Sequence, residues 1–211
     1  MNSFVHQLEA EKNERLAAIT AAGRTSLSGD ATKLLEVALV NEVSVAELAA
    51  LWVPTTPELD VKLAFARQAG DEANHFQLVA DRLAALGVDV AAFVPPPDNP
   101  LFAYLKSLAT TVERIAGGLF TLESIAYAVN ASFMALCEAR GDSETARVYH
   151  DYIQPDERAH QQLGQELLAK YATSPEQQAT ARATTLRVLE IAAATRAKAA
   201  ERLGSACLPG C

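Results

Sequence analysis

Two short motifs in this chain have the residue types and the spacing of metal ligands. Residues 71–75 (DEANH) and 156–160 (DERAH) both read D-E-x-x-H. A glutamate and a histidine three positions apart share one helix face, with about 5–6 Å between their Cβ atoms, so both can bind one ion. Glutamate can bridge two ions and imidazole adds a neutral ligand, which suits iron or manganese better than zinc or copper. The repeat therefore predicts a centre for two metal ions with the ligands Glu72, His75, Glu157 and His160.

A further carboxylate stands where none is expected. Residues 115–137 carry a single charged side chain, Glu123. A helix of this composition is expected to be buried on most sides, and a buried carboxylate must be protonated, ion-paired or metal-bound. Within this stretch alone, ion pairing and metal binding fit equally well. The breaker at 140–142 lies midway between Glu123 and Glu157, so in a helical hairpin the two residues reach the same height. Glu123 is therefore the predicted fifth ligand.

The sixth ligand is expected from the helix that precedes the first motif. Glu36, Glu42 and Glu47 all lie on it, and Glu47 is too near the following turn to meet Glu72. Geometry alone does not separate Glu42 from Glu36, but the two lie on different helix faces, so only one of them can be a ligand.

The aspartate that opens each motif has a predicted role behind the metal. A metal-bound imidazole usually donates its other N–H to a carboxylate or a carbonyl, which sets the tautomer. We expect Asp71 and Asp156 each to serve the histidine of the opposite hairpin. The alternative is that both are ordinary surface acids.

The elements that must position these residues are all predicted to be helices. Alanine, leucine and glutamate dominate, apolar residues recur at three and four positions, and no segment alternates like a strand. Asp30 is a candidate N-cap, Pro57 a candidate first helical residue, and Ser174-Pro175-Glu176 a candidate helix start. Pro155 would either kink its helix or start a new one. The expected helices are 2–22, 31–52, 57–87, 101–139, 143–171 and 175–203.

The connections between these helices predict the topology. Short turns join 31–52 to 57–87 and 101–139 to 143–171, whereas the proline-rich stretch 93–100 makes a longer crossover between the two hairpins. Two antiparallel hairpins with one long connection are typical of the ferritin-like four-helix bundle. We therefore predict a single all-α domain over 1–211, with a core bundle over about 31–171 and flanking helices over 2–22 and 175–203.

Composition excludes several classes of partner. The 211 residues include 26 acidic and 18 basic side chains, a formal net charge of −8, which argues against nucleic acid. Glu123, with no aromatic belt or basic flank around its apolar stretch, argues against a membrane span. We expect a cytoplasmic protein, because the N-terminus lacks the features of a signal peptide and an odd number of cysteines suits a reducing compartment. Cys137 is expected in the core, and Cys207 and Cys211 in a floppy tail.

The motif order resembles the ferritin-like di-iron carboxylate superfamily, whose catalytic members share Glu, DExxH, Glu and DExxH. Within it, the first hairpin looks most like the catalytic subunit of the phenylacetyl-CoA epoxidase type. The residues that carry this likeness are Glu42, Trp52, Pro57, Lys62 and 71–75, followed by Glu157, His160, Gln161 and Gly164 in the second hairpin. The similarity covers about 31–171, and its register makes Glu42, rather than Glu36, the ligand.

The resemblance implies a monooxygenase-like enzyme with two iron ions that activates O₂ and oxidises a small organic substrate, for the epoxidase type a CoA-linked aromatic one. Two manganese ions or a mixed iron–manganese pair are alternatives. The chain shows no flavin or nicotinamide fingerprint, so electrons are expected from an external reductase. Phe120 and Tyr127 lie one turn either side of Glu123 and either line the substrate cavity, with Tyr127 behind the ligands, or are plain core.

Iron handling is the main alternative function. A ferroxidase or storage protein of the ferritin or bacterioferritin kind assembles into a large hollow particle, whereas the oxygenase is expected as a monomer or homodimer. The haem-ligating methionine of bacterioferritin has no counterpart, because Met1 and Met134 are the only methionines. Peroxide reduction of the rubrerythrin kind would need paired CxxC motifs, which are absent. A bundle that binds partners without metal is the remaining alternative.

Overall fold

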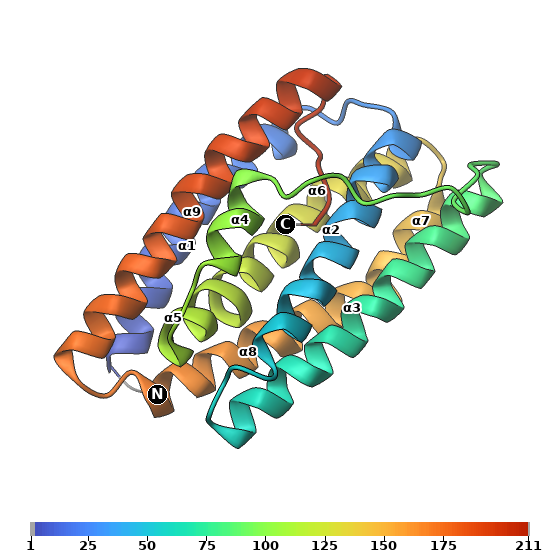
Figure 1. Cartoon of the computed structure of the whole chain (residues 1–211). Coiled ribbons are helices and arrows are strands. Elements are labelled where there is room, and N and C mark those ends of the chain that lie inside the picture. The colour runs from blue at the N-terminus through green and yellow to red at the C-terminus, as the bar shows by residue number, and fades with distance from the viewer. Residues whose placement is uncertain (1–2, 211) are drawn as a thin grey trace.

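The computed structural model describes residues 3–210, which contain helices and no strands (Figure 1). The all-α prediction is confirmed. Two of the helices pass through a π-helical section (η) without a break, so the described residues form seven continuous helices. The elements are α1 (Ser3–Thr25), α2 (Ala31–Trp52), α3 (Leu59–Ala85), α4 (Pro100–Lys106), α5 (Thr111–Ile115), η1 (Ala116–Leu122), α6 (Glu123–Ala139), α7 (Ser143–Val148), η2 (Tyr149–Ile153), α8 (Gln154–Tyr171) and α9 (Pro175–Leu203).

Two of the three predicted helix starts are confirmed. The Asp30 side chain accepts hydrogen bonds from the first backbone N–H groups of α2, and Ser174 makes a capping box with Gln177 at the start of α9. The prediction for Pro57 is wrong: α3 begins at Leu59, and Glu58 is its N-cap. Glu58 has an extended backbone, and its carboxylate accepts a hydrogen bond from Thr111 Oγ1 (2.5 Å), which holds it outside the helix.

The predicted helix 101–139 is broken in the structure. α4 ends at Lys106, and a new helix begins after Thr110, whose side chain forms a capping box with Glu113. This break turns the chain so that α4 packs on α2 and α9 while α5, η1 and α6 run through the centre of the molecule. The T-x-x-E spacing of residues 110–113 is the sequence signal for the break.

The first helix continues two residues past Gly23, where it was expected to end. Gly23 does not terminate α1. It allows a close approach instead, because a Cβ there would lie 3.0 Å from Ser132 Oγ of α6 and 3.1 Å from the Ala206 carbonyl. Helix packing therefore explains this glycine.

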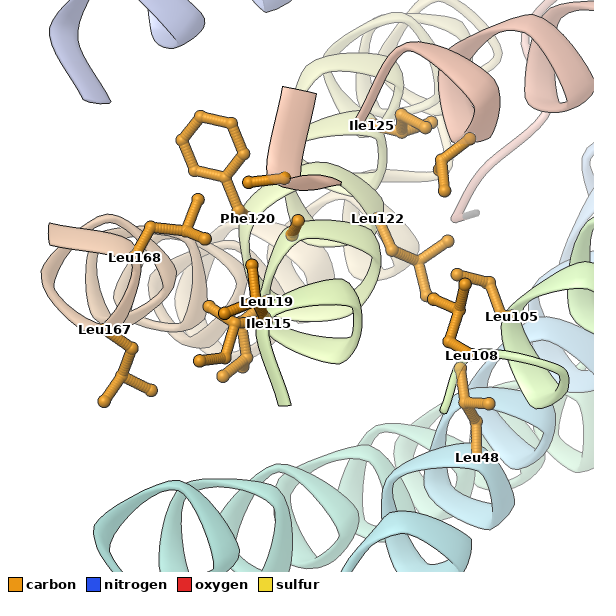
Figure 2. Packing of buried hydrophobic residues seen from close by; sticks show 14 of the residues in the cluster. Leu48, Leu105, Leu108, Ile115, Leu119, Phe120, Leu122, Ile125, Leu167 and Leu168 are labelled. Carbon is orange, nitrogen blue, oxygen red and sulfur yellow. The ribbon is translucent and has the colours of Figure 1, made fainter. Parts of the chain in front are cut away.

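The helix built from α5, η1 and α6 lies at the centre of the molecule. α8, α1 and α9 all pack against it, and in Figure 1 α1 and α9 lie side by side along one edge while α2 and α3 form a hairpin along the other. Figure 2 shows Leu167 and Leu168 of α8 on one side of η1 and Leu105 and Leu108 on the other. By length and composition Thr111–Ala139 could cross a membrane, but 72% of its most apolar window is buried inside the bundle. Burial by neighbouring helices explains why residues 115–137, within this span, carry a single charge.

The segment after α9 was expected to be a floppy tail, and this expectation is wrong. Ser205 and residues 207–210 are buried. The Cys207 thiol is fully covered and donates to the Ser26 carbonyl (3.4 Å) in the turn between α1 and α2, so tertiary contacts order the segment. Cys137 is buried in the core as predicted. Cys211 lies outside the described residues.

Candidate metal centre

Six side chains from the four helices of the two hairpins converge in the interior. They form two groups of four, and within each group the candidate ligand atoms lie within 4.8 Å of one another. All six side chains are buried, and both groups contain Glu72 and Glu157. One group is Glu42, Glu72, His75 and Glu157, and the other is Glu72, Glu123, Glu157 and His160. The residues predicted as ligands therefore lie together, arranged around two adjacent points.

The structure separates the two candidates on α2. Glu42 faces the cluster and is 3% exposed, whereas Glu36 lies on the exposed face of the same helix. Glu47 is also exposed, and its carboxylate lies 3.9 Å from Lys106 Nζ. Of these three glutamates, only Glu42 belongs to the cluster.

Both histidines direct the same ring nitrogen toward the carboxylates. His75 Nδ1 lies 3.3 Å from Glu72 Oε2 and 3.6 Å from Glu42 Oε2. His160 Nδ1 lies 3.5 Å from Glu72 Oε1 and 3.4 Å from Glu123 Oε2. Glu72 thus stands between the two imidazoles, as expected for a carboxylate that bridges two ions.

The other nitrogen of each ring contacts an aspartate from the opposite hairpin. His75 Nε2 lies 3.2 Å from Asp156 Oδ2, and His160 Nε2 lies 3.0 Å from Asp71 Oδ2. A carboxylate acceptor favours a proton on Nε2 and leaves Nδ1 available to a metal. The expected cross-pairing is present in the structure, and its importance for metal binding stays a prediction.

A π-helical turn precedes the ligand on both helices of the second hairpin. η1 ends directly before Glu123, and η2 ends two residues before Pro155 and four before Glu157. Pro155 lacks the N–H that would continue the helical ladder. In η1, Thr121 Oγ1 donates to the Ala116 carbonyl (2.6 Å) across the wide turn. Such turns insert a residue and so rotate the following side chains, and they are frequent at functional sites.

The pKa values show how the metal-free cluster holds its charge. Burial raises the pKa of Glu42 to about 8, and burial together with the charge of Glu123 raises that of Glu157 well above its ordinary value. Burial opposes ionisation of Glu72, but the imidazoles on either side of it outweigh burial and lower its pKa to about 2. Burial likewise opposes protonation of the imidazoles, yet the surrounding glutamates raise the pKa of His75 to about 11 and of His160 to about 12. Without metal, the site is thus held together by imidazolium–carboxylate pairs and protonated acids.

Three buried polar atoms of the cluster have no hydrogen-bond partner, and this indicates whether the cluster fits metal ions. Glu72 Oε1, Glu157 Oε2 and His160 Nδ1 are buried and have no hydrogen-bond partner. Buried polar atoms without partners are rare and costly, and these three all face the centre of the cluster. Cations there would satisfy them, and the charge of two divalent ions would balance four carboxylates. The donor set can therefore hold metal ions, and its oxygen and imidazole atoms suit iron or manganese.

Several neighbours of the ligands were missed by the sequence analysis. Gln68, one turn before Glu72 on α3, donates to Glu123 Oε1. Lys12 of α1 is fully buried and donates to Ser124 Oγ (2.6 Å), which also accepts from Gln161 Nε2 (2.8 Å). The spacing of Gln68 from Glu72 was a usable signal, but nothing local marks Lys12, on a polar helix, as buried.

The two aromatic residues beside Glu123 do not line the small cavity next to the carboxylates. That cavity is bounded by Asn41, Val45, Gly210 and four of the glutamates. Phe120 belongs to the hydrophobic core, with Lys12 Nζ 4.0 Å from its ring centroid. Tyr127 is half-buried, and its carbonyl accepts from Gln154 Nε2 (3.1 Å). For Phe120, the plain-core interpretation fits the structure.

Comparisons of this chain with protein-family models, with curated proteins and with solved structures found no match.

Proposed function

We propose that this protein is a di-iron oxidoreductase that uses O₂ to oxidise a small organic molecule, in the manner of a monooxygenase. The observation that carries the proposal is the pair of buried ligand groups that share Glu72 and Glu157. Two ions that share bridging carboxylates, each completed by one glutamate and one histidine, form the di-iron arrangement of ferritin-like bundles. The two all-helical hairpins and their crossover are compatible with that fold.

Each ligand has a distinct role in this proposal. Glu72 and Glu157 would bridge the ions, Glu42 and His75 would complete one coordination shell, and Glu123 and His160 the other. When bound, the iron ions supply the redox chemistry that reduces O₂ and oxidises the substrate.

The residues around the ligands would hold them in position and keep water out. Asp71 and Asp156 keep a proton on Nε2 of the histidines, so that Nδ1 remains a neutral donor. Gln68 holds one oxygen of Glu123 and thereby orients the other toward His160. The core around η1 and α6 excludes bulk water from the centre.

The proposal extends to the substrate, the electron donor and the assembly of the protein. The likeness to the epoxidase type favours a CoA-linked aromatic substrate. Electrons would come from a separate reductase in the cytoplasm, and a monomer or homodimer is the expected assembly.

Metal analysis tests the proposal directly. Protein purified from iron-supplemented cells should contain about two iron ions per chain, as in the carboxylate-bridged bundles, and its absorption spectrum should change when O₂ is admitted to the reduced form. Glu42→Ala should lose most of the iron, whereas Glu36→Ala, on the exposed face of the same helix, should retain it. Equal occupancy in the two variants, or no metal in the parent, would overturn the assignment.

Particle size separates oxidation from iron storage. A monomer or dimer in gel filtration is expected for the oxidoreductase, and a particle of about 24 subunits would favour a ferritin-like store instead. A small protein that rapidly reduces peroxide but oxidises no organic compound would favour the rubrerythrin-like alternative.

A further inference from the structure

The segment after α9 separates two cavities. A pocket of about 620 Å³ opens between α2, the proline-rich crossover and α9, and its lining includes Asn41, Leu208 and Pro209. The small cavity at the ligands is lined by Asn41 as well, and by Gly210. Consecutive residues of one segment thus line the outer pocket and the ligand cavity. Figure 1 shows this segment running from the end of α9 back across the bundle toward α2 and α6.

Side chains of three different helices hold this segment. Asn41 Nδ2 donates to the Pro209 carbonyl (3.1 Å), and the Gly210 N–H donates to Asn130 Oδ1 (2.8 Å). Arg196 of α9 donates to the carbonyls of Leu208 (2.6 Å) and Gly210 (2.9 Å). Because residues 208–210 belong to no helix, they can move away without unwinding one. Although residues 208–210 are buried, displacing them breaks four hydrogen bonds to side chains and none within a helix, so we expect this segment to open at lower free energy than the helices that carry the candidate ligands.

The outer pocket combines an apolar wall with an excess of positive charge. Val37, Val40 and Phe102 contribute apolar side chains. Its cationic residues are Arg187, Arg196, Lys198 and Arg202, against the acidic residues Asp98 and Glu190. In a chain with a net charge of −8, this local excess favours a ligand that carries a negative group on an apolar body.

We propose that the outer pocket binds an organic anion and that residues 208–210 form a movable wall between this pocket and the metal centre. The inner end of the pocket lies at Asn41, the residue before the ligand Glu42, so displacement of the wall joins the two cavities. The inference rests on the proposed metal centre and adds the route to it and the charge of its substrate.

The wall is tested by the rate at which a chelator removes metal. Co²⁺ bound at the centre gives an absorption band that disappears when excess EDTA extracts the ion. Arg196→Met removes two hydrogen bonds to the wall and should lose Co²⁺ at least about 5-fold faster than the parent. Arg182→Met, on the same helix and outside the pocket, should behave as the parent, since Arg182 pairs with Glu11 of α1 and not with the wall.

A glycine pair provides a second, independent variant. Gly210 and Gly204 both have positive φ, 66° and 64°. An alanine Cβ at position 210 would lie 3.1 Å from Asn41 Nδ2, whereas one at position 204 meets nothing within 4 Å. Gly210→Ala should accelerate Co²⁺ loss and Gly204→Ala should not. Unchanged rates in both Arg196→Met and Gly210→Ala would overturn the wall while leaving the proposed function intact. Failure of the parent to bind Co²⁺ would overturn both.

The outer pocket is tested on the metal-free protein with two fluorescent probes of the same aromatic body. 8-Anilinonaphthalene-1-sulfonate carries a negative charge, and N-phenyl-1-naphthylamine does not. The anionic probe should bind at least about 10-fold more tightly, as expected for one desolvated charge contact. Ala194→Trp, which fills the pocket, should abolish binding, whereas Ala193→Trp, which faces a different groove between α1 and α9, should not. Equal binding of the two probes, or insensitivity to Ala194→Trp, would overturn the assignment.

Discussion

At the scale of single residues, the candidate metal centre is organised by Glu72 and the two imidazoles on either side of it. Both rings direct Nδ1 inward and Nε2 toward an aspartate, so the histidines already have the orientation that metal binding requires. In the metal-free protein, protons occupy the place of the cations. Metal affinity is therefore coupled to pH.

We predict that metal binding releases protons. The pKa values of His75 (about 11) and His160 (about 12) keep both rings protonated at pH 7, and each ring must lose a proton to bind metal. Glu42, with a pKa of about 8, adds a further proton. Apparent affinity for Co²⁺ should therefore rise with pH between pH 6 and pH 8. Calorimetry at pH 7 in two buffers of different ionisation enthalpy should show release of at least two protons, and a binding heat independent of the buffer would contradict this.

The aspartates behind the histidines provide a second prediction. Asp71→Asn and Asp156→Asn should each weaken Co²⁺ binding by about 10–100-fold, because an amide can donate to Nε2 and stabilise the wrong tautomer. Asp81→Asn is the matched control on the exposed face of α3. Titration of the absorption band measures the affinities, and circular dichroism checks the fold. Affinity that is equal in all three variants would show that the aspartates are ordinary surface acids.

At the scale of elements, the central helix depends on close approach by its neighbours. Gly164 of α8 lies against η1, and a Cβ there would be 2.6 Å from backbone atoms of Leu119 and Phe120. The π-helical turn thus occupies the space that a side chain on α8 would need.

We predict that Gly164→Ala destabilises the protein by about 1–3 kcal/mol, because the backbone of η1 must shift. Gly70→Ala should stabilise it by up to about 1 kcal/mol, since Gly70 lies on the exposed face of α3 with nothing within 4 Å of its Cβ position. Urea unfolding of the two variants measures both changes. If Gly164→Ala also stabilises the protein, the backbone of η1 can move away from α8 at little cost, and the prediction is wrong.

Lys12 couples the first helix to the second hairpin, and its burial has a consequence for stability. Burial lowers its pKa from 10.5 to about 8, so between these values the unfolded chain binds more protons than the folded one. Stability should therefore rise with pH by roughly 2–3 kcal/mol between pH 8 and pH 10.5 relative to a protein without this group.

Lys12→Met supplies that reference, and Lys198→Met, at an exposed position of α9, is the control. The unfolding free energy of the parent minus that of Lys12→Met should rise between pH 8 and pH 10.5. The same quantity for Lys198→Met should not show this rise. A constant difference for Lys12→Met would contradict the lowered pKa.

At the scale of the whole molecule, the acidic composition is partly a property of the interior. Four of the 26 acidic residues belong to the cluster, and two divalent ions would change the formal charge from −8 to −4. The surface is then closer to balance than the composition implies.

We predict that metal raises the melting temperature of the parent by at least about 5 °C at saturating Co²⁺, because the ions bind only the folded chain. Glu123→Ala removes one ligand and should lose most of this shift, whereas Glu138→Ala, on the exposed part of α6, should keep it. Thermal unfolding followed by circular dichroism measures the shift. An equal shift in both variants would place the ions elsewhere.

The candidate ligands could be identified from the sequence because helical periodicity is local. The three-residue spacing puts Glu72 beside His75 and Glu157 beside His160 in any helix, and the apolar surroundings of Glu123 imply burial whatever covers it. Caps such as Asp30 and Ser174 likewise act within a few residues, so these two helix starts followed from local chemistry. Glu42 and Glu36 could not be separated in this way, since the distinction depends on which face of α2 meets α3.

The remaining features depend on contacts between distant parts of the chain, and only the tertiary structure decided them. Lys12 is buried because α6 and η1 supply its hydrogen-bond acceptors, more than one hundred residues away. Residues 208–210 are ordered because Asn41, Asn130 and Arg196 bind their backbone, and nothing in the segment itself indicates this. Thus the sequence by itself determined most of the helices and five of the six candidate ligands, through short-range periodicity and capping. Packing between distant segments decided how that centre is enclosed and which part of the chain lies between it and the outer pocket.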